Sequence, residues 1–129
     1  WEVSMVRFTT SVALALGLSV VALPALAQDA TGTWLREGGT SKVRISPCGG
    51  ALCGTTVWLK DSSGPSKVGM RVFYDMKPAG EGSWKGSAFN PEDGKTYSGK
   101  MSLSGNSLTT SGCVMGGLIC KSVSWTRAN

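Results

Sequence analysis

Polar and apolar residues alternate along most of the chain that follows an apolar N-terminal stretch. In the run KVRIS, Val43 and Ile45 fall on one side of an extended backbone and their polar neighbours fall on the other. The run TYSGKMSL repeats the pattern, with Tyr97 and Met101 on the apolar side. A period of two residues indicates a β-strand with one buried and one solvated face. Beyond the N-terminal stretch, no segment shows the period of an amphipathic helix, so we predict an all-β fold.

Runs of turn-forming residues separate the alternating segments. Examples are EGGTS, SSGPS, KPAGEG, NPEDGK and SGNS, which combine Gly with Pro, Asn, Asp or Ser. The pattern predicts eight strands, at about 31–37, 41–47, 52–60, 69–76, 82–90, 95–104, 107–114 and 119–127. Consecutive antiparallel strands with short links favour an up-and-down sheet, and closing that sheet removes its exposed edges. We therefore predict a small eight-stranded antiparallel up-and-down barrel.

Two aromatic motifs lie at opposite ends of this pattern. Gly32 and Trp34 are in the first predicted strand, and Trp125 and Arg127 are in the last. These strands are neighbours in a closed barrel, where an Arg guanidinium over an indole stabilises by about 0.5–2 kcal/mol. We predict that the four residues close one end, an arrangement similar to the calycin pattern of Gly-x-Trp beneath a late Arg. The alternative is that both indoles are ordinary core residues.

The N-terminal stretch has the organisation of an export signal. Met5 is the expected start, with residues 1–4 as an upstream extension, and Arg7 supplies a positive charge. The apolar segment 12–23 follows, and residues 25–27 form a small-residue cleavage site. The apolar segment is shorter than the roughly 20 residues that span a bilayer.

We therefore predict a signal peptide in helical form over residues 1–27 and a single mature domain over residues 28–129. An uncleaved membrane anchor is the alternative. With cleavage, the mature protein has no transmembrane segment and is periplasmic or secreted.

The chain contains four cysteines, at positions that fall in the predicted mature domain: Cys48, Cys53, Cys113 and Cys120. An even number of cysteines in a small exported domain predicts two disulfides. Three pairings are possible, and we favour Cys48 with Cys53 and Cys113 with Cys120 because each pair brackets a Gly-rich turn. A four-cysteine zinc site and a redox site have less support, because the spacings differ from the usual motifs.

The composition argues against catalysis and against nucleic-acid binding. The chain has no His, which removes the commonest general base and metal ligand. Ser98 and Lys100 would point to solvent together, and Glu92 and Asp93 lie in a predicted turn. The formal net charge is +5, yet the basic residues are scattered along the strands and do not form a nucleic-acid footprint. We expect a non-enzymatic protein without cofactor or metal, with weak attraction to anionic envelope polymers or lipids.

Two functions remain. Small barrels hold one small ligand or are filled by side chains. In the first case we expect a small hydrophobic ligand, lined by Trp84, Tyr97, Met101 and Tyr74, in a void that opens opposite the Trp34–Arg127 end. In the second, the protein is a structural or interaction protein of the cell envelope, with a filled barrel and an exposed basic and aromatic patch around Trp58, Lys60 and Arg71.

Several segments together resemble a known family. GTWLR, VRISPCGGALCG, VWLKD, WKGSAFNPEDGKTYSGKMSLSGNSL, GCVMGGLIC and SWTR are similar to the domain of unknown function 2147, a family of small exported bacterial proteins. The resemblance extends from Gly32 to Arg127. It implies a lipocalin-like β-barrel from a Gram-negative bacterium, and it implies no activity.

Overall fold

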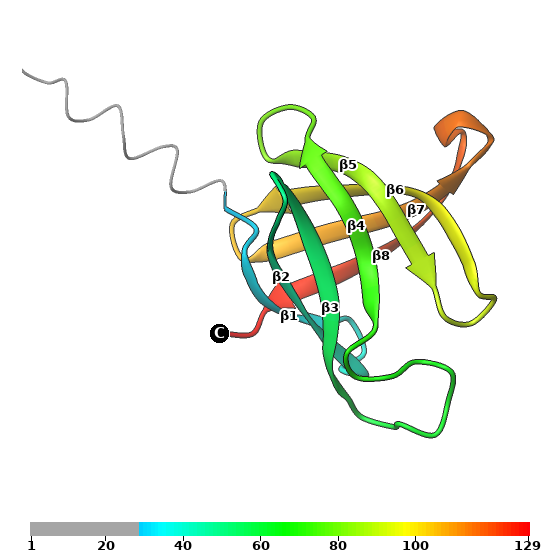
Figure 1. Ribbon diagram of the computed structural model, residues 1–129. Coiled ribbons are helices and arrows are strands. Elements are labelled where there is room, and N and C mark those ends of the chain that lie inside the picture. The colour runs from blue at the N-terminus through cyan, green and yellow to red at the C-terminus, as the bar shows by residue number, and fades with distance from the viewer. Residues whose placement is uncertain (1–28) are drawn as a thin grey trace, which may run out of the picture.

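The computed structural model describes residues 29–129, which form an antiparallel sheet closed into a barrel (Figure 1). The predicted signal helix over residues 1–27 lies outside the described residues. The strands, in chain order, are β1 (Gly32–Arg36), β2 (Ser41–Cys48), β3 (Ala51–Leu59), β4 (Arg71–Pro78), β5 (Ser83–Asn90), β6 (Lys95–Ser104), β7 (Ser107–Val114) and β8 (Ile119–Arg127). A short 3-10 turn, η3 (Met115–Gly117), links β7 to β8.

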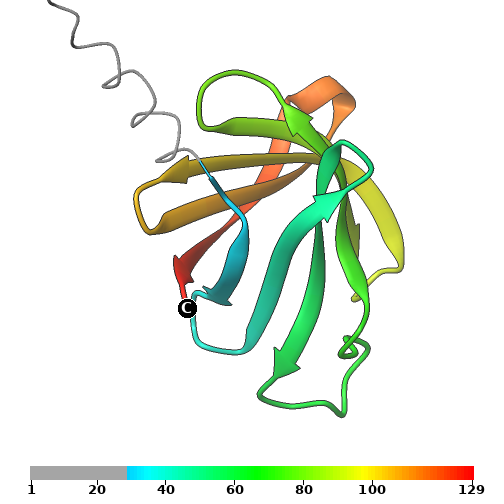
Figure 2. The ribbon, with the colours of Figure 1, turned by 60° about the vertical axis from the view of Figure 1, so that its left-hand side comes forward.

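Each strand pairs with the next, and β1 pairs with β8. Figure 2 shows β1 beside β8, where the sheet closes. The predicted eight-stranded up-and-down barrel is confirmed, and each strand boundary lies within two residues of its predicted position. Within residues 29–129, no helix is long and apolar enough to cross a membrane.

The two ends of the barrel differ. We call one end the closed end: it carries the start of β1, the end of β8 and the β2–β3, β4–β5 and β6–β7 turns. We call the other end the mouth: it is formed by the β1–β2, β3–β4, β5–β6 and β7–β8 connections. Four of the five largest fully buried side chains lie in the part of their strands nearer the closed end, and the fifth lies at the centre of β1. They are Ile45, Met76, Met101 and Leu108, with Trp34 in β1. The packed core therefore fills the closed half of the barrel.

The barrel bends sharply where β4 meets β5. The register between these strands shifts after Tyr74, and Asp75 adopts a positive φ of 48°. A β-carbon on Gly86 would lie 2.4 Å from the Tyr74 carbonyl oxygen, and one on Gly99 would lie 2.9 Å from the Ser87 backbone. These glycines permit close approach of neighbouring strands at a bulged corner.

Candidate functional site

Trp34 and Arg127 seal the closed end. The two residues are register partners on β1 and β8, and the Arg127 guanidinium carbon lies 4.4 Å from the centre of the Trp34 ring. Trp34 is buried, and its indole N–H donates a hydrogen bond of 2.9 Å to the Ala30 carbonyl. Gly32 leaves room for the arginine, because a β-carbon there would lie 3.1 Å from a guanidinium nitrogen.

The same guanidinium ties three segments of the chain together. It donates to the carbonyls of Thr31 and Asp29, both at 3.1 Å, so it holds the segment that enters β1. Its Nε donates to the side-chain oxygen of Asn106, in the β6–β7 turn, at 3.2 Å. Arg127 therefore joins the first strand, the last strand and a turn between them at the closed end.

Trp125, which we predicted to lie with these residues, is placed differently. It pairs with Arg36 in the register between β1 and β8, two residues nearer the mouth than the pair of Trp34 and Arg127. Its ring packs edge-on against Phe73, with centroids 6.2 Å apart and planes at 77°. Trp125 thus belongs to the middle of the barrel, because two residues along a strand separate it from Arg127.

Each disulfide joins the two strands of one hairpin. Cys48 is bonded to Cys53 across the β2–β3 turn at the closed end, and Cys113 is bonded to Cys120 across the β7–β8 connection at the mouth. This is the pairing that we predicted, because each pair of cysteines brackets a Gly-rich turn. No cysteine among residues 29–129 is free.

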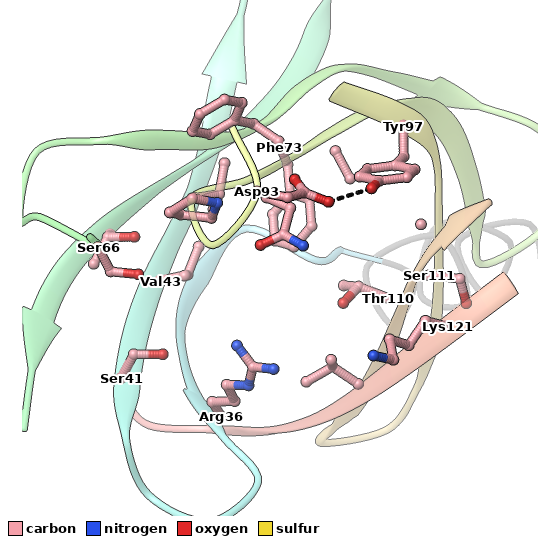
Figure 3. A pocket seen from close by; sticks show the side chains of 18 of the residues that line it. Arg36, Ser41, Val43, Ser66, Phe73, Asp93, Tyr97, Thr110, Ser111 and Lys121 are labelled. Atoms are coloured by element: carbon pink, nitrogen blue, oxygen red, sulfur yellow. Dashed lines mark hydrogen bonds between the residues drawn. The ribbon is translucent and has the colours of Figure 1, made fainter. Parts of the chain in front are cut away.

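A cavity of about 530 Å³ opens at the mouth (Figure 3). Its volume lies in the range of about 300–1,000 Å³ that small-molecule sites occupy. The side chains around it come from all eight strands or their mouth connections, so the cavity lies on the barrel axis above the packed core. The lining residues include Arg36, Val43, Thr56, Phe73, Ala88, Asn90, Asp93, Tyr97, Thr110, Lys121, Val123 and Trp125.

The floor of the cavity is apolar with two hydroxyl groups. Val43, Phe73 and Trp125 are buried there. Thr56 and Thr110 are the only buried polar residues among those described. The Thr110 hydroxyl accepts a 2.9 Å hydrogen bond from the Trp125 indole N–H, which fixes the orientation of that ring.

Charged side chains surround the entrance. Arg36 and Lys121 extend into the cavity from β1 and β8 (Figure 3), and neither side chain donates a hydrogen bond to another of residues 29–129. On the opposite wall the Tyr97 hydroxyl donates a hydrogen bond to the Asp93 carboxylate. That bond, with a second from the Lys95 backbone N–H at 2.9 Å, lowers the pKa of Asp93. The same bond raises the pKa of Tyr97.

The entrance therefore presents two cations that have no hydrogen-bond partner among residues 29–129 and one carboxylate that already accepts hydrogen bonds. Groups of three or more His, Cys, Asp or Glu that could hold a metal ion do not occur within residues 29–129.

Comparison with known proteins identifies the chain's relatives. The family model described as an uncharacterized protein conserved in bacteria (DUF2147) matches residues 32–127. The chain belongs to this family. No curated protein matches the chain. A similar solved structure is protein HP1028 from the human pathogen Helicobacter pylori, described as belonging to the lipocalin family. It has 21% sequence identity and a TM-score of 0.67, and the match covers 78% of this chain and 84% of that one. At that identity the likeness shows the fold, a lipocalin-like barrel.

In this family member, one of the four residues that we predicted to line a ligand cavity is found at the cavity of the mouth. Tyr97 lines the cavity at the mouth. Met101 is buried in the closed half, and Trp84 lines a separate hollow at the closed end. Tyr74 points outward, because its neighbour Phe73 faces the interior. The guanidinium carbon of Arg71 lies 5.8 Å from the centre of the Tyr74 ring. The sequence pattern gives the face of each residue but not its height along the barrel axis.

The prediction missed the two cations at the entrance. A signal for them is present in the sequence: Arg36 lies two residues after Trp34, and Lys121 lies two and four residues before Val123 and Trp125. Strand alternation therefore places both on the inner face.

Proposed function

We propose that this protein binds a small, largely hydrophobic ligand in the cavity at the mouth of its barrel, and that it is a binding protein, not an enzyme. The observation that carries the proposal is an open cavity of about 530 Å³ with an apolar floor above a separately packed core. Small-molecule sites are typically concave, mostly apolar and furnished with a few polar groups. The fold supports this function only in general terms, because it is shared with a protein described as a lipocalin.

The polar groups around the cavity favour a ligand with an anionic end. Arg36 and Lys121 extend into the entrance, whereas the apolar residues lie below them. An anion at the entrance would form charge-assisted hydrogen bonds with these side chains. The opposing Asp93 carboxylate already accepts bonds from Tyr97 and Lys95, so it competes less strongly for the two cations. We infer a ligand with an apolar body and a carboxylate or similar group.

The compartment is also part of the proposal. Two disulfides favour an oxidising environment, and the predicted signal peptide favours export to the periplasm or beyond. A ligand carrier there would shield an apolar molecule from water between membranes or partners.

The alternative, an envelope protein with a filled barrel, has less support because the interior at the mouth is open. The exposed Trp58 that we expected in its contact patch is 40% exposed, and the Lys42 ammonium lies 5.4 Å from its ring. This local pair accounts for the exposed indole without a partner protein.

Titration with single-chain amphiphiles tests the proposal. Three ligands with the same alkyl chain, a carboxylic acid, an alcohol and an amine, are compared by calorimetry with the oxidised protein below their micellar concentrations. We expect the acid to bind most tightly and the amine least. Arg36→Gln should weaken acid binding by about tenfold, since a hydrogen bond to a charged group contributes roughly 1.5 kcal/mol. Lys85→Gln, on the exposed face of β5, is the matched control and should have no effect.

A second variant tests the location. Ala88→Phe fills part of the cavity, and Ala88 is only partly buried, so the barrel should still fold. The proposal predicts loss of binding by this variant. Saturable binding that Ala88→Phe leaves unchanged, or no binding of any of the three amphiphiles, contradicts it.

A further inference from the structure

The tip of the β7–β8 hairpin exposes a cluster of apolar side chains. We define the hairpin tip as residues 114–119. Within it Leu118 is 83% exposed, Met115 69%, Ile119 58% and Val114 41%. Clustered exposed apolar residues in a folded protein commonly mark a contact with another surface. Figure 1 shows this hairpin projecting beyond the body of the barrel.

The shape of the tip is held by the chain itself. The Cys113–Cys120 disulfide joins the two strands immediately below it. Met115 adopts a positive φ of 55°, which is unusual for a residue other than glycine, and Gly116 and Gly117 follow with positive φ as well. This backbone presents the apolar side chains in a fixed arrangement, and a fixed arrangement loses less conformational freedom when it binds.

The C-terminal part of the chain, which contains the tip, carries basic residues and no acidic ones. From residue 95 to residue 129 the chain has no Asp or Glu, and its basic residues are Lys95, Lys100, Lys121 and Arg127. Two of these lysines lie beside the hairpin tip. Lys121 directly follows the disulfide, and the Lys100 ammonium lies 3.7 Å from the place that a β-carbon on Gly117 would occupy.

We propose that the hairpin tip inserts into the surface of an anionic lipid bilayer. Apolar side chains on a convex, uncharged tip can enter the boundary between head groups and acyl chains, while lysines around the tip contact anionic head groups. A concave partner protein would have to match the tip residue by residue, whereas a bilayer requires only apolar side chains with cations beside them. The arrangement of charge and exposure therefore favours a membrane.

The position of the tip gives this contact a role. Val114 and Ile119 are part of the tip and also line the cavity. Insertion of the tip would place the mouth of the barrel against the bilayer. A ligand drawn from lipid could then pass to the cavity without crossing water. The membrane contact itself does not depend on ligand binding, so the two can fail separately.

Vesicle sedimentation tests the proposal with the purified, oxidised protein. Vesicles of phosphatidylcholine with phosphatidylglycerol are compared with vesicles of phosphatidylcholine alone. We expect binding to the anionic vesicles, and weaker binding as salt is raised. Leu118→Ser should lower the partition coefficient by about tenfold, since one large apolar side chain is removed from the lipid. Lys100→Gln should lower it by about fivefold on anionic vesicles only.

Two controls make the test specific. Val68→Ser replaces an apolar residue that is 61% exposed at the same end of the barrel but in the β3–β4 connection, and it should lower binding much less than Leu118→Ser. Leu118 is so exposed that Leu118→Ser should keep the parent's melting temperature, which separates lost contact from lost folding. Equal losses from Val68→Ser and Leu118→Ser overturn the assignment of the contact to the hairpin.

The other results also decide the matter. Equal binding to both vesicle types overturns the anionic part of the proposal, and binding to neither overturns all of it. Sedimentation equilibrium detects self-association. A dimer that Leu118→Ser dissociates, without vesicle binding, replaces the membrane with a second copy of this chain.

Discussion

The closed end of the barrel depends on Arg127, and its replacement gives a prediction whose size follows from the structure. Arg127→Ala removes a guanidinium that lies 4.4 Å from the Trp34 ring centre and that makes three side-chain hydrogen bonds. The cation–π contact contributes about 0.5–2 kcal/mol. The hydrogen bonds to Thr31, Asp29 and Asn106 are partly or fully exposed, so water replaces much of their contribution. We expect a loss of about 2–3 kcal/mol in the free energy of unfolding.

The assay is urea unfolding of the oxidised protein, followed by far-ultraviolet circular dichroism, with thermal melting beside it. A loss of that size lowers the melting temperature of a domain this small by roughly 8–20 °C. Arg127→Lys keeps the charge but not the planar fork, so its loss should be intermediate. Trp34→Ala should cost more, about 3–5 kcal/mol, because a buried indole leaves a cavity. If Arg127→Ala melts together with the parent, the closed-end argument is wrong.

Two further predictions concern the cavity. Tyr97 donates a hydrogen bond to Asp93, which raises the pKa of Tyr97 above 10.0 and lowers the pKa of Asp93 below 3.8. The bond therefore contributes its full stabilisation of the fold between pH 3.8 and pH 10.0. That stabilisation is lost as the pH falls through the lowered pKa of Asp93 or rises through the raised pKa of Tyr97. In a Tyr74→Phe background, tyrosinate absorbance should show that Tyr97 ionises above its ordinary pKa. Asp93→Asn should return the pKa of Tyr97 toward its ordinary value. A Tyr97 titration that Asp93→Asn leaves unchanged would exclude the hydrogen bond. Thr110→Val removes the acceptor of the buried Trp125 indole N–H and should cost about 1–3 kcal/mol in urea unfolding, whereas an unchanged midpoint would mean that water replaces the hydroxyl.

The strands were predictable from the sequence because their information is local. Alternation in runs such as KVRIS gives each strand its inner and outer face, and Gly-rich turns end it. The closed end was predictable for a similar reason, since closing the sheet must bring the first and last strands together. The positions of Trp34 and Arg127 at the two extremes of the pattern then place them side by side.

The cavity was not predictable in the same way. Whether an inward residue belongs to the packed core or to the cavity depends on its height along the barrel axis, and the stagger between strands determines that height. Met101 and Tyr97 share the inner face of β6, yet Met101 is in the core and Tyr97 is at the mouth. Arg36 and Lys121 were overlooked because an inward cation is unfavourable in a filled barrel and becomes acceptable only where the interior is open to solvent.

Native mass spectrometry of the oxidised protein, purified without refolding, tests the central claim most directly. If the cavity binds a ligand, the folded chain should carry an added mass that disappears on denaturation, and the Ala88→Phe variant should lack it. After incubation with excess single-chain fatty acid, the parent should take up one equivalent. A folded chain that carries no added mass in either experiment would contradict the proposal that the cavity binds a small ligand.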